Sequence, residues 1–333
     1  MTAAHTVCLG TIGSGIWRSE DQGQSWANIR DGIWNDNNIY SLTADPTDPR
    51  VIYAGTQEGI FRSDDRAVSF RRLEGPLNDY QVWAIAVDPQ EPDTIMAGCG
   101  PSAFFRSRDA GRTWQKMDVP LAEKCPNVRE PRATALVIDP NDSRIVWAGI
   151  EVDGVRCSLD GGDTWTAIGA TAMGEADVGE GIWDPDIHDI VISRGSPSLV
   201  ITSTPKEIFT SSDLGESWSP LKVKDYFPTM YCRPMALKEN DSNVLFVGNG
   251  DGPFGDTGSI QRSKDQGKTW ETCDLPVEPN TGIWRFATHA SDPDMVYACS
   301  HFGQVYASYD GGENWKKLRR DFGEIWTMAV TPN

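Results

Sequence analysis

The chain has 333 residues, of which 39% are hydrophobic, so it holds enough apolar material for a sizeable core. Its 48 acidic residues outnumber its 30 basic ones, and the net charge of -18 works against binding nucleic acid or an anionic membrane surface. No stretch approaches the length of a transmembrane helix, and the first residues lack the pattern of a secretory signal. Seven irregularly spaced cysteines favour reduced thiols, so we expect a cytoplasmic protein.

The predicted elements are short strands in a repeating order. The chain begins with two strands, at 5–10 and 15–19, which match the second and third strands of later units. A first strand at 39–46 ends in Asp-Pro and is followed by strands at 51–55 and 59–63. No run keeps a helical period over ten or more residues, so the pattern predicts an all-β fold.

A short motif recurs after each third strand. Six segments read Ser-x-Asp-x-Gly-x-x-Trp, and a seventh, degenerate copy has Ala67 in place of the glycine and Phe70 in place of the tryptophan. The motif aspartates, spaced 44 to 53 residues apart, are Asp21, Asp65, Asp109, Asp160, Asp213, Asp265 and Asp310. Ser and Asp side chains accept and donate hydrogen bonds within tight turns, and Gly supplies a positive φ.

Four strands per unit of this length are typical of a propeller blade. The motif resembles the Asp-box (BNR repeat) family of sialidases, sortilin-type receptors, xyloglucanases and a photosystem assembly factor, and the resemblance covers essentially the whole chain. It implies that the motif aspartates are structural residues on the face away from the ligand site.

The two ends of the chain complete one another. The last segment, 324–332, matches a first strand with nothing after it, and the chain starts with a second strand. We therefore expect residues 1–333 to form a single domain, a seven-bladed β-propeller in which the C-terminal strand completes the N-terminal blade and leaves no exposed sheet edge.

The family resemblance implies a ligand site at the mouth of the central channel, where first strands begin and second strands end. Alignment of the repeats brings aromatic and ionisable residues to this end: Trp83, Trp284, Trp326, Tyr231, Arg132, Arg233, Arg285, Asp186, His188, Asp189, Glu151 and His301. Tryptophan walls with converging charges are typical of a small-molecule site, whereas the alternative is that these residues only solvate the rim of a filled channel.

The same residues suggest chemical roles. His188, flanked by Asp186 and Asp189, is a candidate general acid or base, with Glu151 as a further carboxylate. The arginines Arg132, Arg233 and Arg285 are candidates to hold an anionic substrate, with Tyr231, His301 and the three tryptophans as further substrate contacts. Two long loops, which contain Glu175, Asp177, Glu180 and Trp183, and Arg129 and Glu130, are expected to reach the same mouth.

No cofactor motif is present, and a divalent metal held by His188, His301 and Glu151 is a candidate. The loop with Asp251 and Asp256 resembles a calcium loop but lacks the final glutamate of an EF-hand. Two hypotheses follow. The first is an intracellular hydrolase or lyase that acts by general acid–base chemistry on a small polar substrate, anionic or aromatic. The second is a non-catalytic propeller scaffold that binds a ligand or a protein partner, because the fold alone does not select a function.

Overall fold

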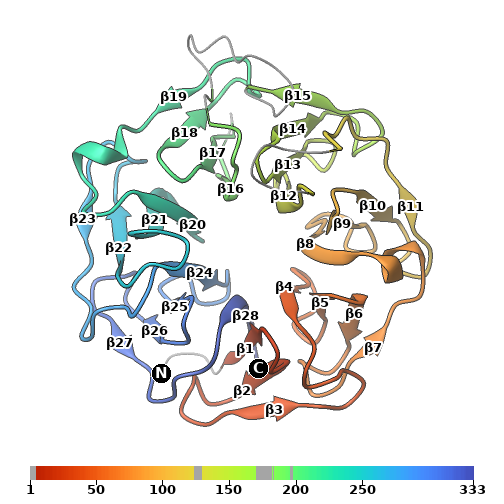
Figure 1. The fold of residues 1–333 in the computed structure, drawn as a ribbon, viewed down its shortest axis with the longest axis horizontal. Helices are drawn as coiled ribbons and strands as arrows, with labels where there is room; N and C mark the ends of the chain where they lie inside the picture. Colours follow the sequence, from red (N-terminus) through yellow and green to blue (C-terminus); the bar gives the residue numbers. More distant parts are fainter. Residues whose placement is uncertain (1–4, 124–129, 170–181, 183, 196–197) are drawn as a thin grey trace.

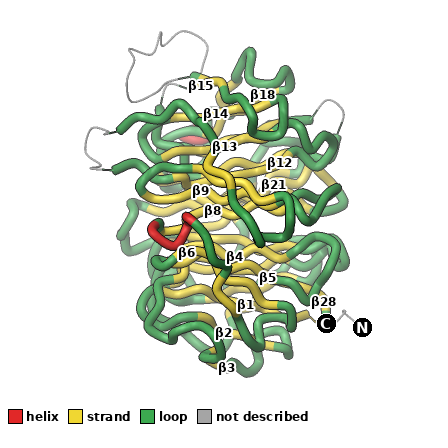
Figure 2. The backbone as a smooth tube through the Cα atoms, turned by 90° about the vertical axis from the view of Figure 1, so that its right-hand side faces the viewer, coloured by secondary structure: helices red, strands yellow, loops and turns green. Residues whose placement is uncertain are grey.

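Seven four-stranded antiparallel sheets surround a central axis in the computed structural model, which describes residues 5–123, 130–169, 182, 184–195 and 198–333 (Figure 1). Seen edge-on, the strands run across the thickness of the ring and the loops gather on its two faces (Figure 2). The innermost strands are β28 (Ile325–Pro332), β4 (Ile39–Ala44), β8 (Gln81–Val87), β12 (Ala133–Ile138), β16 (Asp189–Ile192), β20 (Tyr231–Lys238) and β24 (Ile283–Thr288). This architecture confirms the predicted seven-bladed β-propeller.

The remaining strands complete each blade outward. The second strands are β1 (His5–Thr11), β5 (Ile52–Thr56), β9 (Ile95–Gly100), β13 (Val146–Ile150), β17 (Val200–Ser203), β21 (Asp241–Gly250) and β25 (Val296–Ser300). The third are β2 (Ile16–Ser19), β6 (Gly59–Ser63), β10 (Phe104–Ser107), β14 (Gly154–Ser158), β18 (Ile208–Ser211), β22 (Gly258–Ser263) and β26 (Val305–Ser308).

The outermost strands are short: β3 (Ala27–Ile29), β7 (Arg71–Arg72), β11 (Gln115–Lys116), β15 (Thr166–Ile168), β19 (Ser219–Pro220), β23 (Glu271–Thr272) and β27 (Lys316–Lys317). The helical turns in the described residues are η1 (Pro76–Asp79) and η2 (Val223–Asp225). Neither of them is long enough or apolar enough to cross a membrane.

The ring is closed by pairing between the two ends of the chain. β28 lies inside β1 in an antiparallel ladder that runs from His5 opposite Pro332 to Gly10 opposite Thr327. Beside this blade, Phe322 packs edge-on against Trp17 and Trp26 at ring-centre distances of 5.7 and 5.0 Å. The predicted completion of the N-terminal blade by the C-terminal strand is therefore confirmed.

The core lies between neighbouring blades, because each sheet buries both of its faces against the next sheet. Tyr53 of one blade and Ile85 and Phe105 of the next share one such cluster. Each large side chain buried in this way stabilises the fold by about 1.5–3 kcal/mol.

The Asp-box hairpins lie between the third and fourth strands. In the fourth copy, Ser158 Oγ donates to Asp160 Oδ1 (2.8 Å) and accepts the amide of Gly162 (2.8 Å). Asp160 also accepts the amide and the hydroxyl of Thr164, at 2.8 and 2.6 Å. The degenerate copy around Asp65 has the same four bonds, with Ala67 at φ 59° in the glycine position. These contacts make the motif aspartates structural.

A hydrogen-bonding residue four positions after each aspartate belongs to the motif, although the eight-residue pattern did not include it. The residues are Ser25, Ser69, Thr113, Thr164, Ser217, Thr269 and Asn314. The sequence contained a signal for this contact, because all seven copies have a hydrogen-bond donor at the same position. Such a pattern indicates that each donor binds the aspartate of its own hairpin.

Arginines on four of the third strands tie their blades to the next one. Arg262 donates to the carbonyl oxygen of Gly311 in the following Asp box (2.9 Å) and pairs with Glu313 (2.9 Å). Arg106 makes the corresponding bonds to Gly161 and Asp163, and Arg18 and Arg62 donate to the equivalent carbonyls. The hairpins therefore contribute to blade-to-blade packing as well as to their own turns.

The Asp-box carboxylates predict a loss of stability in acid. The hydrogen bonds from Thr164 and Ser158 lower the pKa of Asp160 to about 2 from 3.8. A group with a depressed folded-state pKa stabilises the fold above its unfolded pKa, and this contribution disappears as the pH falls from about 4 to 2. In urea titrations at pH 7, 4 and 2.5, we expect Asp160→Asn to be less stable than the wild type at pH 7, with a deficit that shrinks at pH 2.5.

The matched control is Glu216→Gln, an exposed residue of the neighbouring hairpin, which should not change the pH dependence. A deficit of Asp160→Asn that stays constant across the three pH values would contradict the assignment.

Candidate functional site

β-Bulges at the start of the innermost strands aim side chains into the mouth of the channel. In five strands one extra residue interrupts the register with the second strand: Tyr40, Trp83, Thr134, Trp284 and Trp326. In β20 the interruption contains Arg233 and Pro234, and His188 directly precedes β16. A bulge turns its extra residue out of the normal alternation, which explains why these aligned positions converge.

Four of these residues form a layer that we call the aromatic floor, namely Tyr40, Trp83, Trp284 and Trp326. Tyr40 and Trp83 stack with ring centres 4.0 Å apart, and Trp326 meets Trp83 edge-on at 5.1 Å and Trp284 at 5.7 Å. Trp83 is 8% exposed and Trp284 is 4% exposed. The expectation of open tryptophan walls is therefore wrong for these two residues, because they fill the channel at its mouth.

Two arginines cover this floor. The guanidinium of Arg132 lies 4.0 Å from the ring centre of Trp83, and that of Arg233 lies 3.7 Å from the ring centre of Trp284. Arg132 also pairs with Glu151 (2.8 Å), and Arg233 donates to the hydroxyl of Tyr231 (3.2 Å). A guanidinium group can stack on an aromatic face and at the same time donate hydrogen bonds in its own plane. The layer therefore presents ordered guanidinium groups to the mouth.

His188 connects this layer to a carboxylate. Its Nδ1 lies 2.6 Å from the carbonyl oxygen of Cys232, its Nε2 lies 3.6 Å from Asp186 Oδ2, and its ring is 5.0 Å from that of Tyr231. Because a carbonyl oxygen only accepts, Nδ1 carries a proton in this contact, and the same ring orientation places Nε2 opposite Asp186.

Two neighbouring carboxyl groups at this point have opposite electrostatic surroundings. Burial raises the pKa of Asp184, and the negative charge of Asp186 adds to this effect. Burial also opposes ionisation of Asp186, but the hydrogen bond and charge of His188, together with Arg233, lower its pKa. Asp184 therefore keeps a proton to higher pH than Asp186, and it also accepts the amide of Asp186 (3.1 Å). Asp184 was not among the predicted site residues, although it lies two positions before one of them.

Positive charge is concentrated at the floor. Burial lowers the pKa of Arg233, and the charges of Arg285 and Arg132 lower it further. The three predicted arginines thus lie near one another in a protein with a net charge of -18.

Arg285 and Asp189 lie deeper in the channel than the other predicted residues. Both line a cavity of about 240 Å³ below the floor, where Arg285 Nε donates to the carbonyl of Trp326 (3.2 Å) and Asp189 accepts the amide of Met235 (2.9 Å). Burial raises the pKa of Asp189. Asp189 therefore faces the interior of the channel, and it does not join Asp186 and His188 at the mouth.

His301 is a core residue, which corrects its prediction as a substrate contact. It is fully buried, with its ring 4.0 Å from that of Trp284 and 5.1 Å from that of Phe302. Neither ring nitrogen has a hydrogen-bond partner among the described residues. Burial, followed by the charge of Arg233, lowers the pKa of His301 to about 4.

The predicted metal site does not assemble. Within the described ranges, no group of three or more His, Cys, Asp or Glu side chains is arranged to hold a metal ion. The physical reason is that each candidate has another partner: Glu151 pairs with Arg132, His188 contacts Asp186, and His301 packs on Trp284.

Exposed aromatic residues on the same face of the ring as the mouth were missed by the sequence reasoning. Trp34 lies between β3 and β4 and is 71% exposed, and Phe254 lies between β21 and β22 and is 68% exposed. Phe302, between β25 and β26, is also exposed. Both kinds of loop open onto the mouth. An aromatic residue among Gly, Asp and Asn in a predicted loop was the available signal.

A side pocket of about 340 Å³ lies beside the floor, lined by Gln81, Trp83, Gly100, Pro101, Glu130, Arg132 and Glu151. Glu130 therefore reaches the mouth as expected. The predicted contributions of Arg129, Glu175, Asp177, Glu180 and Trp183 lie outside the described residues.

The fold and this mouth define a seven-bladed propeller whose bulged inner strands present arginine and carboxylate groups over an aromatic floor. The chain belongs to the Sortilin-Vps10 family, described as "Sortilin, neurotensin receptor 3", whose model matches residues 14–125 and 206–331.

Curated relatives include xyloglucanases. The chain is 26% identical to xyloglucanase Xgh74A of Acetivibrio thermocellus, over 96% of this chain and 36% of that protein. It is 23% identical to a xyloglucanase of a Paenibacillus species, over 96% of this chain and 30% of that protein. The chain thus spans about a third of the length of these relatives.

Two kinds of solved structure share the fold. The GH74 enzyme of Niastella koreensis matches with a TM-score of 0.66 and 19% identity, over 84% of this chain and 45% of that one. YCF48 bound to a D1 peptide matches with a TM-score of 0.57 and 17% identity, over 87% of this chain and 83% of that one.

The buried, neutral His301 predicts a second pH effect on stability. Because its folded-state pKa of about 4 lies below the ordinary 6.5, its contribution is complete above pH 6.5 and is lost as the pH falls towards 4. We expect His301→Phe, which keeps an aromatic ring between Trp284 and Phe302, to lose less stability than the wild type between pH 6.5 and 4 in urea titrations. Imidazole NMR signals of His301 that titrate near pH 6.5 would contradict this.

Proposed function

We propose that this protein is a hydrolase of glycosidic bonds that acts on a glycan at the mouth of the channel. The observation that carries the proposal is the pair of carboxyl groups of Asp184 and Asp186: Asp184 accepts the amide of Asp186 (3.1 Å), and Asp186 lies 3.6 Å from His188. These unlike surroundings shift the two pKa values in opposite directions. Glycoside hydrolysis needs one carboxylic acid that still holds its proton and one carboxylate that has lost it.

The proposed reaction assigns a role to each group. Asp184 donates its proton to the oxygen of the leaving sugar, and Asp186 accepts a proton from the water that attacks the anomeric carbon. His188 is a positioning residue for Asp186: its Nε2 faces the carboxylate, while its Nδ1 is bound to the carbonyl oxygen of Cys232. Arg233 adds positive charge that keeps Asp186 ionised.

The rim supports a polymeric substrate. Trp34, Phe254 and Phe302 expose flat apolar faces around the mouth, and such faces pack against the apolar faces of sugar rings. Named relatives act on xyloglucan, a polysaccharide. The substrate proposed here is therefore a glycan chain, in place of the small anionic or aromatic molecule that the sequence suggested.

Kinetics on xyloglucan and on its oligosaccharides test the chemistry. We expect Asp184→Asn and Asp186→Asn each to lower kcat by at least about 100-fold, since general acid–base catalysis contributes on the order of 10²–10⁴-fold. The wild type should show an acidic optimum, because activity requires ionised Asp186, whose pKa lies below 3.8, and protonated Asp184, whose pKa lies above 3.8.

The control is Asp142→Asn, an exposed carboxylate on the Asp-box face that pairs with Arg144 and should leave activity unchanged. Full activity of both mouth variants, with the fold verified by circular dichroism, would overturn the catalytic assignment.

The rim predicts a separate effect on binding. We expect Trp34→Ala and Phe254→Ala to raise KM for the polymer several-fold, at about 1–2 kcal/mol of lost packing per ring, while kcat for a short chromogenic glycoside stays constant. A loss of kcat on the short substrate would place these rings at the reaction centre instead.

A second candidate is a non-catalytic module that binds a protein segment. The observation that favours it is the match to YCF48, which extends over 83% of that chain, whereas the GH74 enzyme is matched over 45%. Saturable binding of a peptide at the mouth, without turnover of any glycan, would select this candidate.

A further inference from the structure

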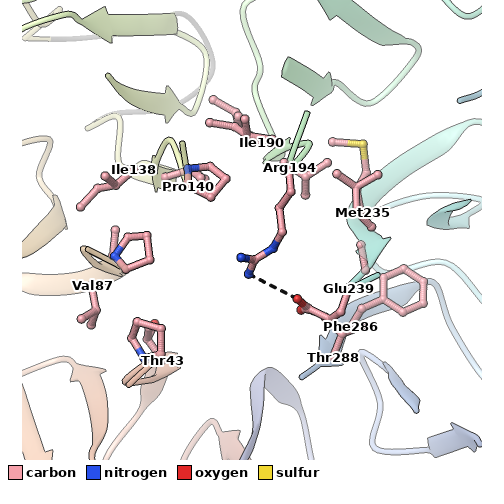
Figure 3. Close-up of a pocket in the computed structure, with 18 of the residues that line it drawn as sticks. Thr43, Val87, Ile138, Pro140, Ile190, Arg194, Met235, Glu239, Phe286 and Thr288 are labelled. Atoms are coloured by element: carbon pink, nitrogen blue, oxygen red, sulfur yellow. Dashed lines mark hydrogen bonds and ion pairs between the residues drawn. The ribbon is translucent and has the colours of Figure 1, made fainter. Parts of the chain in front are cut away.

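The channel is filled at the mouth but open at its other end. On the Asp-box face, the ends of the innermost strands line a cavity of about 420 Å³ whose walls include Val87, Ile138, Ile190, Met235 and Phe286 (Figure 3). The alternative of a filled channel, left open by the sequence, does not hold at this end, because apolar side chains at the strand ends leave a cavity between them. We call this cavity the rear funnel.

The rear funnel is suited to an amphipathic ligand. Its lining combines apolar side chains with charged and hydroxyl groups, namely Thr43, Arg194, Lys238, Glu239, Ser242 and Thr288. A concavity of this kind favours a molecule that has both an apolar body and a charged group. Its volume falls within the range of about 300–1,000 Å³ typical of small-molecule pockets. The aromatic floor closes the mouth side, so a ligand enters from the Asp-box face.

One ion pair crosses the rear funnel. Arg194, which follows β16, extends into the opening towards Glu239, which lies between β20 and β21 (Figure 3). Their closest contact, Arg194 Nη2 to Glu239 Oε2, is 3.5 Å long, and the side chain of Arg194 is 59% exposed. Glu239 is anchored separately, because its Oε1 accepts the hydroxyl of Thr288 (2.8 Å).

The other basic group at the funnel is already occupied. Lys238 pairs with Asp294 (2.7 Å) and donates to Asn240 (2.6 Å). Arg194 is therefore the cation with spare donor capacity at this opening, as judged from the described residues. A guanidinium can bind both oxygens of a carboxylate, and this geometry is better met by an incoming ligand than by Glu239 at its present distance.

We propose that the rear funnel is a second ligand site, separate from the mouth, for a small amphipathic carboxylate. The apolar body of the ligand occupies the space between Val87, Ile138 and Met235, and its carboxylate pairs with Arg194. Glu239 competes with the ligand for the same guanidinium. The site does not depend on the proposed hydrolase activity.

Calorimetric titration of the full chain with octanoate at low salt tests this site. We expect saturable 1:1 binding. Arg194→Gln should weaken it by about tenfold or more, because the variant loses the charge-assisted pair with the carboxylate. Glu239→Gln should strengthen binding, because it removes the competing carboxylate. The neutral probe 1-octanol should bind the wild type and Arg194→Gln equally.

The matched control is Arg144→Gln, another exposed arginine on the same face that is paired with a carboxylate, Asp142 (2.6 Å). It should leave octanoate binding unchanged. Absence of saturable octanoate binding to the wild type would overturn the proposal, and so would equal weakening by the two arginine variants. Glycan assays of the same variants keep this result distinct from the mouth, since a failed hydrolase assay does not affect octanoate binding.

Discussion

Closure of the ring is the constraint on which the structure depends. β28 must lie inside β1, so seven wedge-shaped sheets share one axis and every blade buries both faces against its neighbours. The short outer strands gain additional support from the Asp-box turns and from arginines such as Arg262, which reach the backbone of the next hairpin. Local turn chemistry and blade-to-blade packing therefore reinforce one another at the circumference.

The same closure divides the channel into two unlike halves. At the mouth, bulges rotate bulky residues such as Trp83 and Trp326 inward, and their rings are large enough to meet across the axis. At the other end, apolar wall residues such as Val87 and Ile138 leave a cavity between them. One strand set thus produces a packed floor and an open, partly apolar funnel.

Charge follows this division. The protein carries a net charge of -18, yet Arg132, Arg233 and Arg285 gather around the aromatic floor. Because these groups are removed from water, each charge acts strongly on its neighbours. Glu151 pairs with Arg132. Arg233 and His188 keep Asp186 ionised, next to Asp184, which is protonated more easily. The different surroundings separate the pKa values of these two neighbouring carboxyl groups, and this separation is what general acid–base chemistry needs.

The sequence by itself determined the seven blades, the closing strand and the structural nature of the Asp boxes, because these features repeat and follow from local hydrogen bonding. It also aligned Trp83, His188 and Arg233 at one end of the channel. Only the tertiary structure decided which of the aligned residues face solvent: it buried His301 and turned Asp189 into the channel. It also placed Arg194, which the repeats did not single out, at the rear opening. The reason is that exposure and pairing depend on side-chain size across the axis, which no single repeat contains.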